Sequence, residues 1–119
     1  MTWKPEVDEI KKRRELALAQ GGPGAIAKQH GQHRLTIRER VDQLLDAGSF
    51  EELGPVAGTP VYNESGELVS YDPANFILGL GSVNGRRVIV GGEDFTMRGG
   101  APSPAGLRKS VYAEDLAVQ

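Results

Sequence analysis

The stretch between residues 75 and 100 constrains the fold most, because it places a hairpin signal between two apolar runs. Asn84-Gly85 lies between an apolar run at 76–83 and a second one at 88–90. A two-residue type I′ turn needs positive φ at both central residues, and Asn-Gly is a favoured pair there. The turn predicts a strand register with these pairs: Val83 with Arg86, Gly81 with Val88, and Gly79 with Val90.

The first strand of this hairpin has two unlike faces. Phe76, Leu78 and Leu80 alternate onto one face, as the period of two in a strand requires. The other face carries Gly79 and Gly81, so a neighbouring segment can approach the backbone closely there. The strand is therefore expected to lie between two layers.

Two glycine pairs follow the hairpin. Gly91-Gly92 is expected to end the second strand, residues 94–97 to form a third strand, and Gly99-Gly100 to turn the chain into a helix. Ser103 is the expected N-cap and Pro104 the first helical residue. The inner face of that helix is expected to consist of Leu107, Val111, Leu116 and Val118. This order is typical of the opening of a layered α/β domain.

Helical patterns dominate the residues before the hairpin. Residues 4–20 predict a helix with acids before bases, and residues 25–30 a further helical turn. Thr36 and Glu39 form a capping box that starts a helix, which Gly48 is expected to stop. Its expected apolar positions are Ile37, Val41, Leu44 and Leu45. Residues 54–74 predict a mobile loop excursion, in which 61–62 can pair with 68–69.

Composition excludes several classes of protein. With 119 residues, net charge −2 and no cysteine, the chain suits one small domain without disulfides. The balance of charge argues against nucleic-acid binding, and no apolar run is long enough to cross a membrane. We expect a cytoplasmic protein. His30 and His33 have the spacing of metal ligands, but no nearby residue completes a site, so no metal is expected.

The last helix ends in the middle of its apolar pattern, without a glycine, proline or basic last turn. A helix after a strand needs a following strand to complete its crossover. We therefore expect further chain after residue 119, or a surface from another chain, to complete the domain.

Three blocks of sequence resemble the N-terminal part of the carboxyltransferase subunit of biotin-dependent acyl-CoA carboxylases, such as the propionyl-CoA and methylcrotonyl-CoA carboxylases. The first block is KQH at 28–30, LTIRERV at 35–41 and LLDAGSFEE at 44–52. The second is GLGSVNGR at 79–86, followed by DFT at 94–96 and Gly99-Gly100. The third is Lys109 with DLA at 115–117. Three departures leave the acyl group open: His33-Arg34 stands for a usual Gly-Lys, Arg98 for an apolar residue, and Ala101 for Ser.

The resemblance implies a crotonase-like spiral fold and the transfer of a carboxyl group from carboxybiotin to the α-carbon of an acyl-CoA. It implies three regions: an N-terminal helical segment at 1–53, the excursion at 54–74, and an incomplete crotonase-like domain from 75 to 119. Biotin would be carried by a biotin carboxylase or biotin carrier partner, and active sites would form between copies of the subunit. The family's segment that stabilises the biotin oxyanion is absent.

Candidate ligand-binding residues lie around the start of the last helix. Lys109 coincides with a lysine of the family, and Arg108 is its neighbour, so both are candidates for the phosphates of CoA. Gly99 and Gly100 are the candidate backbone donors, with a purely structural glycine turn as the alternative. No catalytic residue is assigned. The alternative function is a non-catalytic assembly or CoA-binding module.

Overall fold

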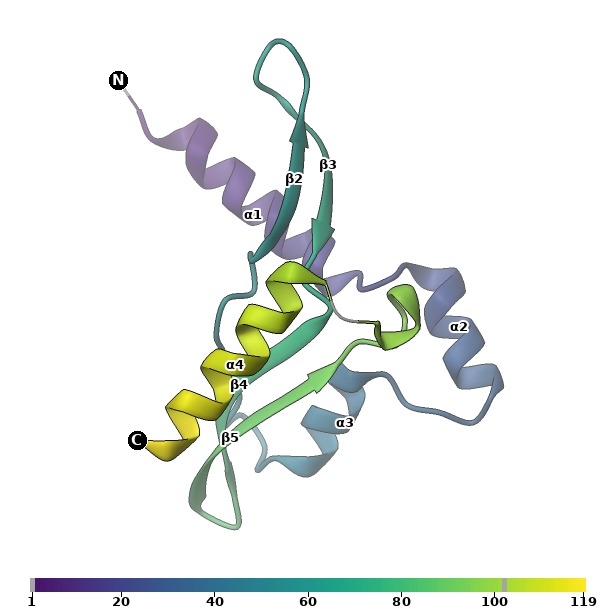
Figure 1. Ribbon diagram of the computed structural model, residues 1–119, viewed down its shortest axis with the longest axis vertical. Coiled ribbons are helices and arrows are strands. Elements are labelled where there is room, and N and C mark those ends of the chain that lie inside the picture. Colours follow the sequence, from purple (N-terminus) through teal and green to yellow (C-terminus); the bar gives the residue numbers. More distant parts are fainter. Residues whose placement is uncertain (1, 102) are drawn as a thin grey trace.

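The computed structural model describes residues 2–101 and 103–119. Three helices come first along the chain, then five strands, and then a short 3₁₀ turn and a last helix (Figure 1). The helices are α1 (Lys4–Leu18), α2 (Pro23–Gly31), α3 (Ile37–Leu44) and α4 (Pro104–Val118), with a short 3₁₀ turn, η1, at Arg98–Gly100. The strands are β1 (Glu51–Glu52), β2 (Gly58–Tyr62), β3 (Leu68–Pro73), β4 (Phe76–Val83) and β5 (Arg86–Glu93). None of the described helices is long and apolar enough to cross a membrane.

The predicted hairpin is confirmed in its turn and in its register. β4 and β5 pair antiparallel, with all three predicted residue pairs in place. Asn84 and Gly85 take φ values of 50° and 80°, as a type I′ turn requires. The Asp46 carboxylate accepts hydrogen bonds from both turn N–H groups, at 2.9 and 2.8 Å, and so ties the turn to the segment after α3.

The prediction of a third strand at 94–97 is wrong. β5 continues through Gly91-Gly92 to Glu93, because these residues keep their pairing with β4. Residues 94–97 form a turn instead, in which the Asp94 carboxylate accepts from the Thr96 N–H at 2.9 Å. The third strand of the sheet is β1, which pairs with β4 on the side opposite β5.

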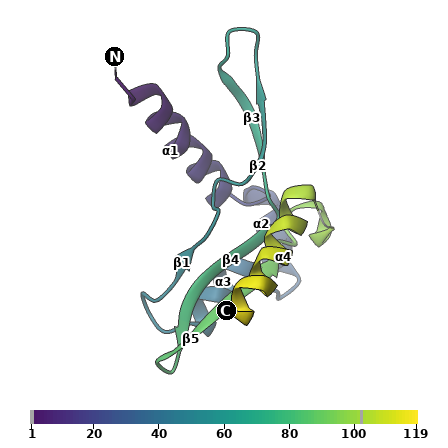
Figure 2. The ribbon, with the colours of Figure 1, turned by 60° about the vertical axis from the view of Figure 1, so that its left-hand side comes forward.

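Helices cover the two faces of this sheet, α3 on one and α4 on the other (Figure 2). Helix α3 and the residue that follows it pack on the glycine face of the β4–β5 hairpin. The sequence predicts such a close approach at the glycines of β4. A Cβ added at Gly81 would lie 2.4 Å from Leu45, and one added at Gly92 of β5 would lie 2.5 Å from Ile37. The apolar face of β4, with Leu78 only 1% exposed, lies beneath α4.

Helix α3 begins as predicted and ends earlier than predicted. Both hydrogen bonds of the Thr36–Glu39 capping box are present. The helix ends at Leu44 rather than near Gly48, since Leu45 is already extended. Leu45 is 7% exposed and fills the space over Gly81, whereas Leu44 is 57% exposed, contrary to its predicted core position.

Helix α4 starts where predicted, but the predicted inner face is wrong. The Ser103 hydroxyl caps it by accepting from the Gly106 N–H at 3.1 Å. The buried residues of the helix are Gly106 and Lys109. Three of the four residues predicted to face inward are exposed by more than half, and Leu116 is intermediate: Leu107 57%, Val111 53%, Val118 88%. The rotation of the helix is set by Gly106, whose Cα approaches Asn75 so closely that a Cβ would lie 2.5 Å from the amide oxygen.

The β2–β3 hairpin and α1 project together from one end of the molecule (Figure 1). The pairing expected across 63–67 is present and extends from Gly58 to Pro73. Lys12 of α1 donates to the Leu68 carbonyl at 3.3 Å, and the Arg13 guanidinium lies 5.5 Å from the centre of the Tyr71 ring. This contact keeps Tyr71 8% exposed, so the hairpin is anchored to the helix at its base.

Candidate functional site

A cavity of about 400 Å³ lies between the inner side of α4 and the segment that joins β1 to β2. Its volume is within the range of small-molecule sites. It contains both cations that the sequence singled out, Lys109 and Arg108. Its other lining residues are Leu53, Gly54, Ala57, Gly58, Leu78, Ala105 and Tyr112.

Lys109 is the buried cation of this cavity. Its residue is 9% exposed, and its ammonium donates a hydrogen bond of 3.1 Å to the Gly54 carbonyl. Gly54 takes φ 63°, a conformation suited to glycine, and its Cα lies against the lysine stem. An ammonium has three donors, and in the described part of the chain only one of them has a hydrogen-bond partner.

Burial lowers the pKa of Lys109 from its usual value, because removal from water disfavours the charged form. Glu52 raises this pKa and Arg38 lowers it further. Glu52 is itself held by a two-pronged ion pair, with the Arg38 nitrogens 3.0 and 2.9 Å from its oxygens. An anionic ligand beside Lys109 would favour the charged ammonium.

Arg108 and Lys109 lie at different depths of the same cavity. The sequence predicts that adjacent helical residues diverge, and Arg108 is indeed exposed whereas Lys109 is buried. Both nevertheless line the cavity, Lys109 from within and Arg108 from the rim. Two cations at different depths suit a ligand with more than one phosphate.

Gly99 and Gly100 do not line this cavity. They form η1 with Arg98, and all three residues take positive φ: 52° for Arg98, 59° for Gly99 and 81° for Gly100. The Gly100 N–H donates to the Met97 carbonyl at 3.0 Å. That N–H is therefore used within the turn.

Asn75 positions the start of α4, and sequence reasoning did not identify this residue. It is 2% exposed; its amide donates to the Ala101 carbonyl, and its oxygen accepts from the Ser103 hydroxyl at 3.1 Å. Its carbonyl accepts from the Asp94 N–H at 2.7 Å. The sequence does contain a signal for this role, an asparagine directly before an apolar strand. A buried side-chain amide needs hydrogen-bond partners, and the start of a neighbouring helix can supply them.

His30 takes part in a hydrogen bond with a carboxylate. Its Nε2 lies 2.7 Å from the Glu39 carboxylate, which joins α2 to the capping box of α3. Across residues 2–101 and 103–119, no group of three or more His, Cys, Asp or Glu is placed to bind a metal ion.

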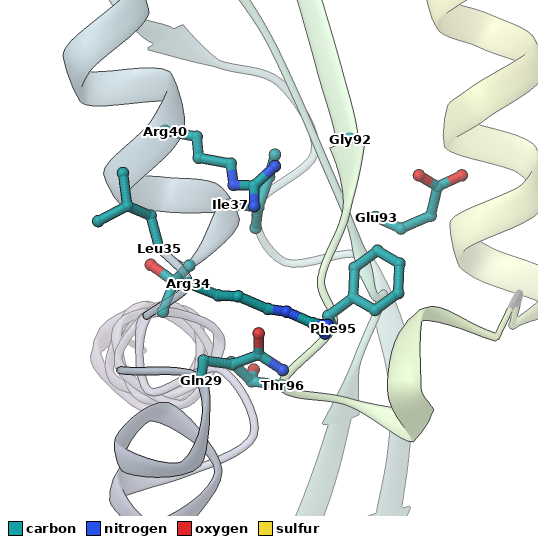
Figure 3. Close-up of a pocket in the computed structure, with 10 residues that line it drawn as sticks. Gln29, Arg34, Leu35, Ile37, Arg40, Gly92, Glu93, Phe95 and Thr96 are labelled. Atoms are coloured by element: carbon teal, nitrogen blue, oxygen red, sulfur yellow. The ribbon is translucent and has the colours of Figure 1, made fainter. Parts of the chain in front are cut away.

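A second groove, of about 350 Å³, lies on the opposite face of the sheet (Figure 3). It is bounded by α2, by the start of α3 and by the end of β5 with the turn that follows. Its lining residues are Gln29, Arg34, Leu35, Thr36, Ile37, Arg40, Gly92, Glu93, Phe95 and Thr96.

The sequence matches the model of a known protein family. Residues 28–119 match the model of the carboxyl transferase domain. The chain belongs to the carboxyl transferase family. Family relatives include the carboxyltransferase subunit of propionyl-CoA carboxylase of Haloferax mediterranei, 34% identical over the whole chain, and the propionyl-CoA carboxylase beta chain of Roseobacter denitrificans, 37% identical over 98% of it.

Solved structures of carboxyl transferases confirm the fold. A transcarboxylase 12S structure with methylmalonyl-coenzyme A bound superposes with a TM-score of 0.78, at 29% identity over 98% of this chain. The beta subunit of Pseudomonas aeruginosa geranyl-CoA carboxylase gives 0.71, at 26% identity over 94%. The expectation of a crotonase-like opening is thereby confirmed. The chain spans 23% of the length of the propionyl-CoA carboxylase relatives and of the 12S subunit.

The structure shows the local conformation or contact of two residues that depart from the family pattern. His33 has φ 58°, so the residue that stands for the usual glycine occupies a left-handed position that favours glycine. Arg98 pairs with the Asp72 carboxylate of β3, so the charged replacement ties the 3₁₀ turn to the hairpin. Neither His33 nor Arg98 lines the cavity of Lys109.

Proposed function

We propose that this chain forms the CoA-side part of a biotin-dependent carboxyltransferase that moves a carboxyl group from carboxybiotin to the α-carbon of an acyl-CoA. The observation that carries the proposal is Lys109: a family lysine, buried inside a cavity, whose ammonium has a single hydrogen-bond partner, the Gly54 carbonyl, among residues 2–101 and 103–119. The family match over 28–119 supports the same activity.

The proposed role of the two cations is recognition of phosphate. Lys109 would meet one phosphate of CoA from inside the cavity, and Arg108 another at the rim, since charge-assisted hydrogen bonds are the strong ones. Leu53, Leu78 and Tyr112 supply apolar wall for the organic part of the ligand. Gly99 remains a proposed backbone donor, although it lines neither the cavity nor the groove, whereas the N–H of Gly100, the other candidate, already donates to the Met97 carbonyl.

Biotin chemistry requires partners beyond this chain. Carboxybiotin supplies the carboxyl group and would arrive on a biotin carrier or biotin carboxylase partner. No residue of this chain is assigned to the biotin side. The other proposed partners are further copies of the subunit, and the proposed compartment is the cytoplasm. Neither nucleic acid nor a membrane is a proposed partner. We expect no turnover of acyl-CoA with free carboxybiotin from residues 1–119 alone.

The test is a chimera in which this chain replaces the matching stretch of the Roseobacter denitrificans beta chain. Lys109→Met keeps the apolar stem and removes the ammonium. It should raise the KM for acyl-CoA and spare kcat, because a phosphate contact far from the reacting carbon is equal in ground and transition states. The effect should shrink with a dephospho-CoA substrate if the 3′-phosphate is the partner.

A matched control separates binding from stability. Lys11→Met removes an exposed ammonium from α1 and should leave KM unchanged. A Lys109→Met chimera that melts lower but keeps its KM would assign the lysine a purely structural tie to Gly54. Binding of CoA to residues 1–119 without activity in the chimera would favour the alternative, a non-catalytic CoA-binding or assembly module.

A further inference from the structure

Helix α1 carries a row of large apolar side chains that lies open to solvent. Trp3, Val7 and Ile10 follow one another at spacings of four and three, so they lie on one side of the helix. Their exposed fractions are 74%, 44% and 44%. The helix contacts the β2–β3 hairpin through other residues, Lys12 and Arg13. A contiguous apolar row, unlike a single exposed side chain, indicates a contact surface.

Arg14 continues this row, four residues after Ile10. It is exposed, and in the described part of the chain no carboxylate lies within 4.0 Å of its guanidinium. An arginine over a tryptophan ring makes a favourable cation–π contact within about 6 Å. Arg14 and Trp3 of one helix are about 16 Å apart along its axis, so a contact between these residues requires a second copy of the helix.

The order of charges in α1 favours a second copy that runs in the opposite direction. The first half of the helix is acidic and the second half is basic: Lys4, Glu6, Asp8 and Glu9, then Lys11, Lys12, Arg13, Arg14 and Glu15. An antiparallel pair places the acidic half of each copy beside the basic half of the other, whereas a parallel pair places like charges together. Charge therefore selects the direction, and the apolar row supplies the burial.

The shape of the molecule leaves room for an antiparallel pair. Figures 1 and 2 both show the N-terminal end of α1 projecting away from the sheet, with the rest of the chain beyond the other end of the helix. An antiparallel pair holds the two sheets at opposite ends of the helix pair. A parallel pair would bring them to the same end.

One register accounts for all four residues of the row. In a two-fold symmetric contact, residue i touches residue j of the other copy, and j touches i. The pairs Trp3 with Arg14 and Val7 with Ile10 are symmetric about the same point, between residues 8 and 9. From this geometry we infer that α1 pairs antiparallel with α1 of a second copy of this chain, with Trp3 against Arg14 and Val7 against Ile10.

The inferred dimer is weak and separate from the proposed acyl-CoA site. A single helix of 15 residues buries less surface than a standard interface, so we expect a Kd of roughly 10 μM to 1 mM. Residues of α1 line neither the cavity of Lys109 nor the groove on the other face, and α1 precedes the family match at 28–119. Dimer formation and acyl-CoA binding can therefore fail separately.

Sedimentation velocity of residues 1–119 at rising concentration tests the inference. The chain should change reversibly from monomer to dimer. The emission of Trp3, the only tryptophan, should move to shorter wavelength over the same concentrations, because its ring leaves water in the pair. A chain that stays monomeric at about 1 mM, the upper end of the expected range, would overturn the inference.

Two aspartate variants locate the contact. Ile10→Asp places a carboxylate in the pair from each copy and should raise the Kd about tenfold or more. Val111→Asp is the matched control on α4, since Val111 is 53% exposed and Ile10 is 44% exposed; it should dimerise as the original chain does. Both positions are exposed, so both variants should keep their melting temperature. Loss of the dimer in Val111→Asp but not in Ile10→Asp would move the contact to α4 and overturn the inference.

Single cysteines test the direction of pairing, because the chain has no cysteine of its own. A Trp3→Cys chain mixed with an Arg14→Cys chain should form the mixed disulfide, while Val7 and Ile10 still hold the pair. Neither chain alone should form a disulfide, since the two copies of each position lie about 16 Å apart along the axis. Disulfides within each chain alone would show parallel pairing and contradict the inferred register.

A membrane surface is the other occupant that an apolar row with cations could have. Vesicles of phosphatidylserine and phosphatidylcholine, added to the chain at a concentration where it is monomeric, should leave the emission of Trp3 unchanged. A shift to shorter wavelength with vesicles, together with a chain that does not dimerise, would replace the second copy by a lipid surface.

Discussion

Replacing Gly79 by alanine tests the packing of the sheet on which the site depends. Gly79 lies in β4 opposite Glu52 of β1, and a Cβ there would lie 2.5 Å from the Glu51 carbonyl oxygen and 2.3 Å from the Phe50 ring. The ring can rotate, but the carbonyl belongs to the backbone. The contact must lengthen by at least 0.5 Å to reach 3.0 Å, the lower limit for real Cβ contacts, so β1 must move.

The expected cost follows from two opposing effects. Overpacking of this kind destabilises by about 1–3 kcal/mol, whereas alanine restricts the unfolded chain and returns about 0.4–1 kcal/mol. The net loss is about 1–2 kcal/mol. An unfolding entropy of about 2.1 cal/mol/K per residue then predicts a melting temperature lower by about 4–8 °C. Displacement of β1 should also weaken the Arg38–Glu52 pair and move Gly54 away from Lys109.

Urea unfolding and thermal melting measure this loss. Gly24→Ala in α2 is the matched control, because nothing lies within 4 Å of its added Cβ and its φ is not positive. The control should be neutral or slightly stabilising. A Gly79→Ala chain within about 0.5 kcal/mol of the original, the usual range of surface changes, would refute the close packing of β1 on β4.

Three further predictions concern local backbone and charge. Gly85→Val should destabilise by about 1 kcal/mol or more, since a β-branched residue resists the φ of 80° found there; an unchanged melting curve would count against the turn. His33→Gly should stabilise by up to about 1 kcal/mol in urea unfolding, because it relieves a left-handed φ of 58°, and a loss of stability would show that the imidazole makes a compensating contact. The hydrogen bond from His30, with those from Thr36, lowers the pKa of Glu39 from 4.5 to about 2. The ionised Glu39 carboxylate therefore stabilises the folded chain above pH 4.5, and this stabilisation is lost as the pH falls toward 2. Glu39→Gln should flatten that part of the stability curve in urea unfolding at a series of pH values, and an equal slope in both chains would contradict the assignment.

Local features could be predicted from the sequence because they depend on a few neighbouring residues. The Asn84-Gly85 turn requires positive φ, and a two-residue loop then fixes the whole register of β4 with β5. The Thr36–Glu39 capping box and the Ser103 cap each join groups three residues apart. The family resemblance added the crotonase-like opening and placed Lys109 among the candidates.

Tertiary structure decided the features that depend on distant partners. β5 runs past Gly91-Gly92 because β4 continues to pair with it, and β1 takes the place of the expected third strand because its two residues reach the other edge. Close approach of Gly106 to Asn75 rotates α4, so that Leu107 faces outward and Lys109 inward. Only that rotation brings the Lys109 ammonium to the Gly54 carbonyl, 55 residues away, since helical spacing alone favours the apolar side chains for the buried face.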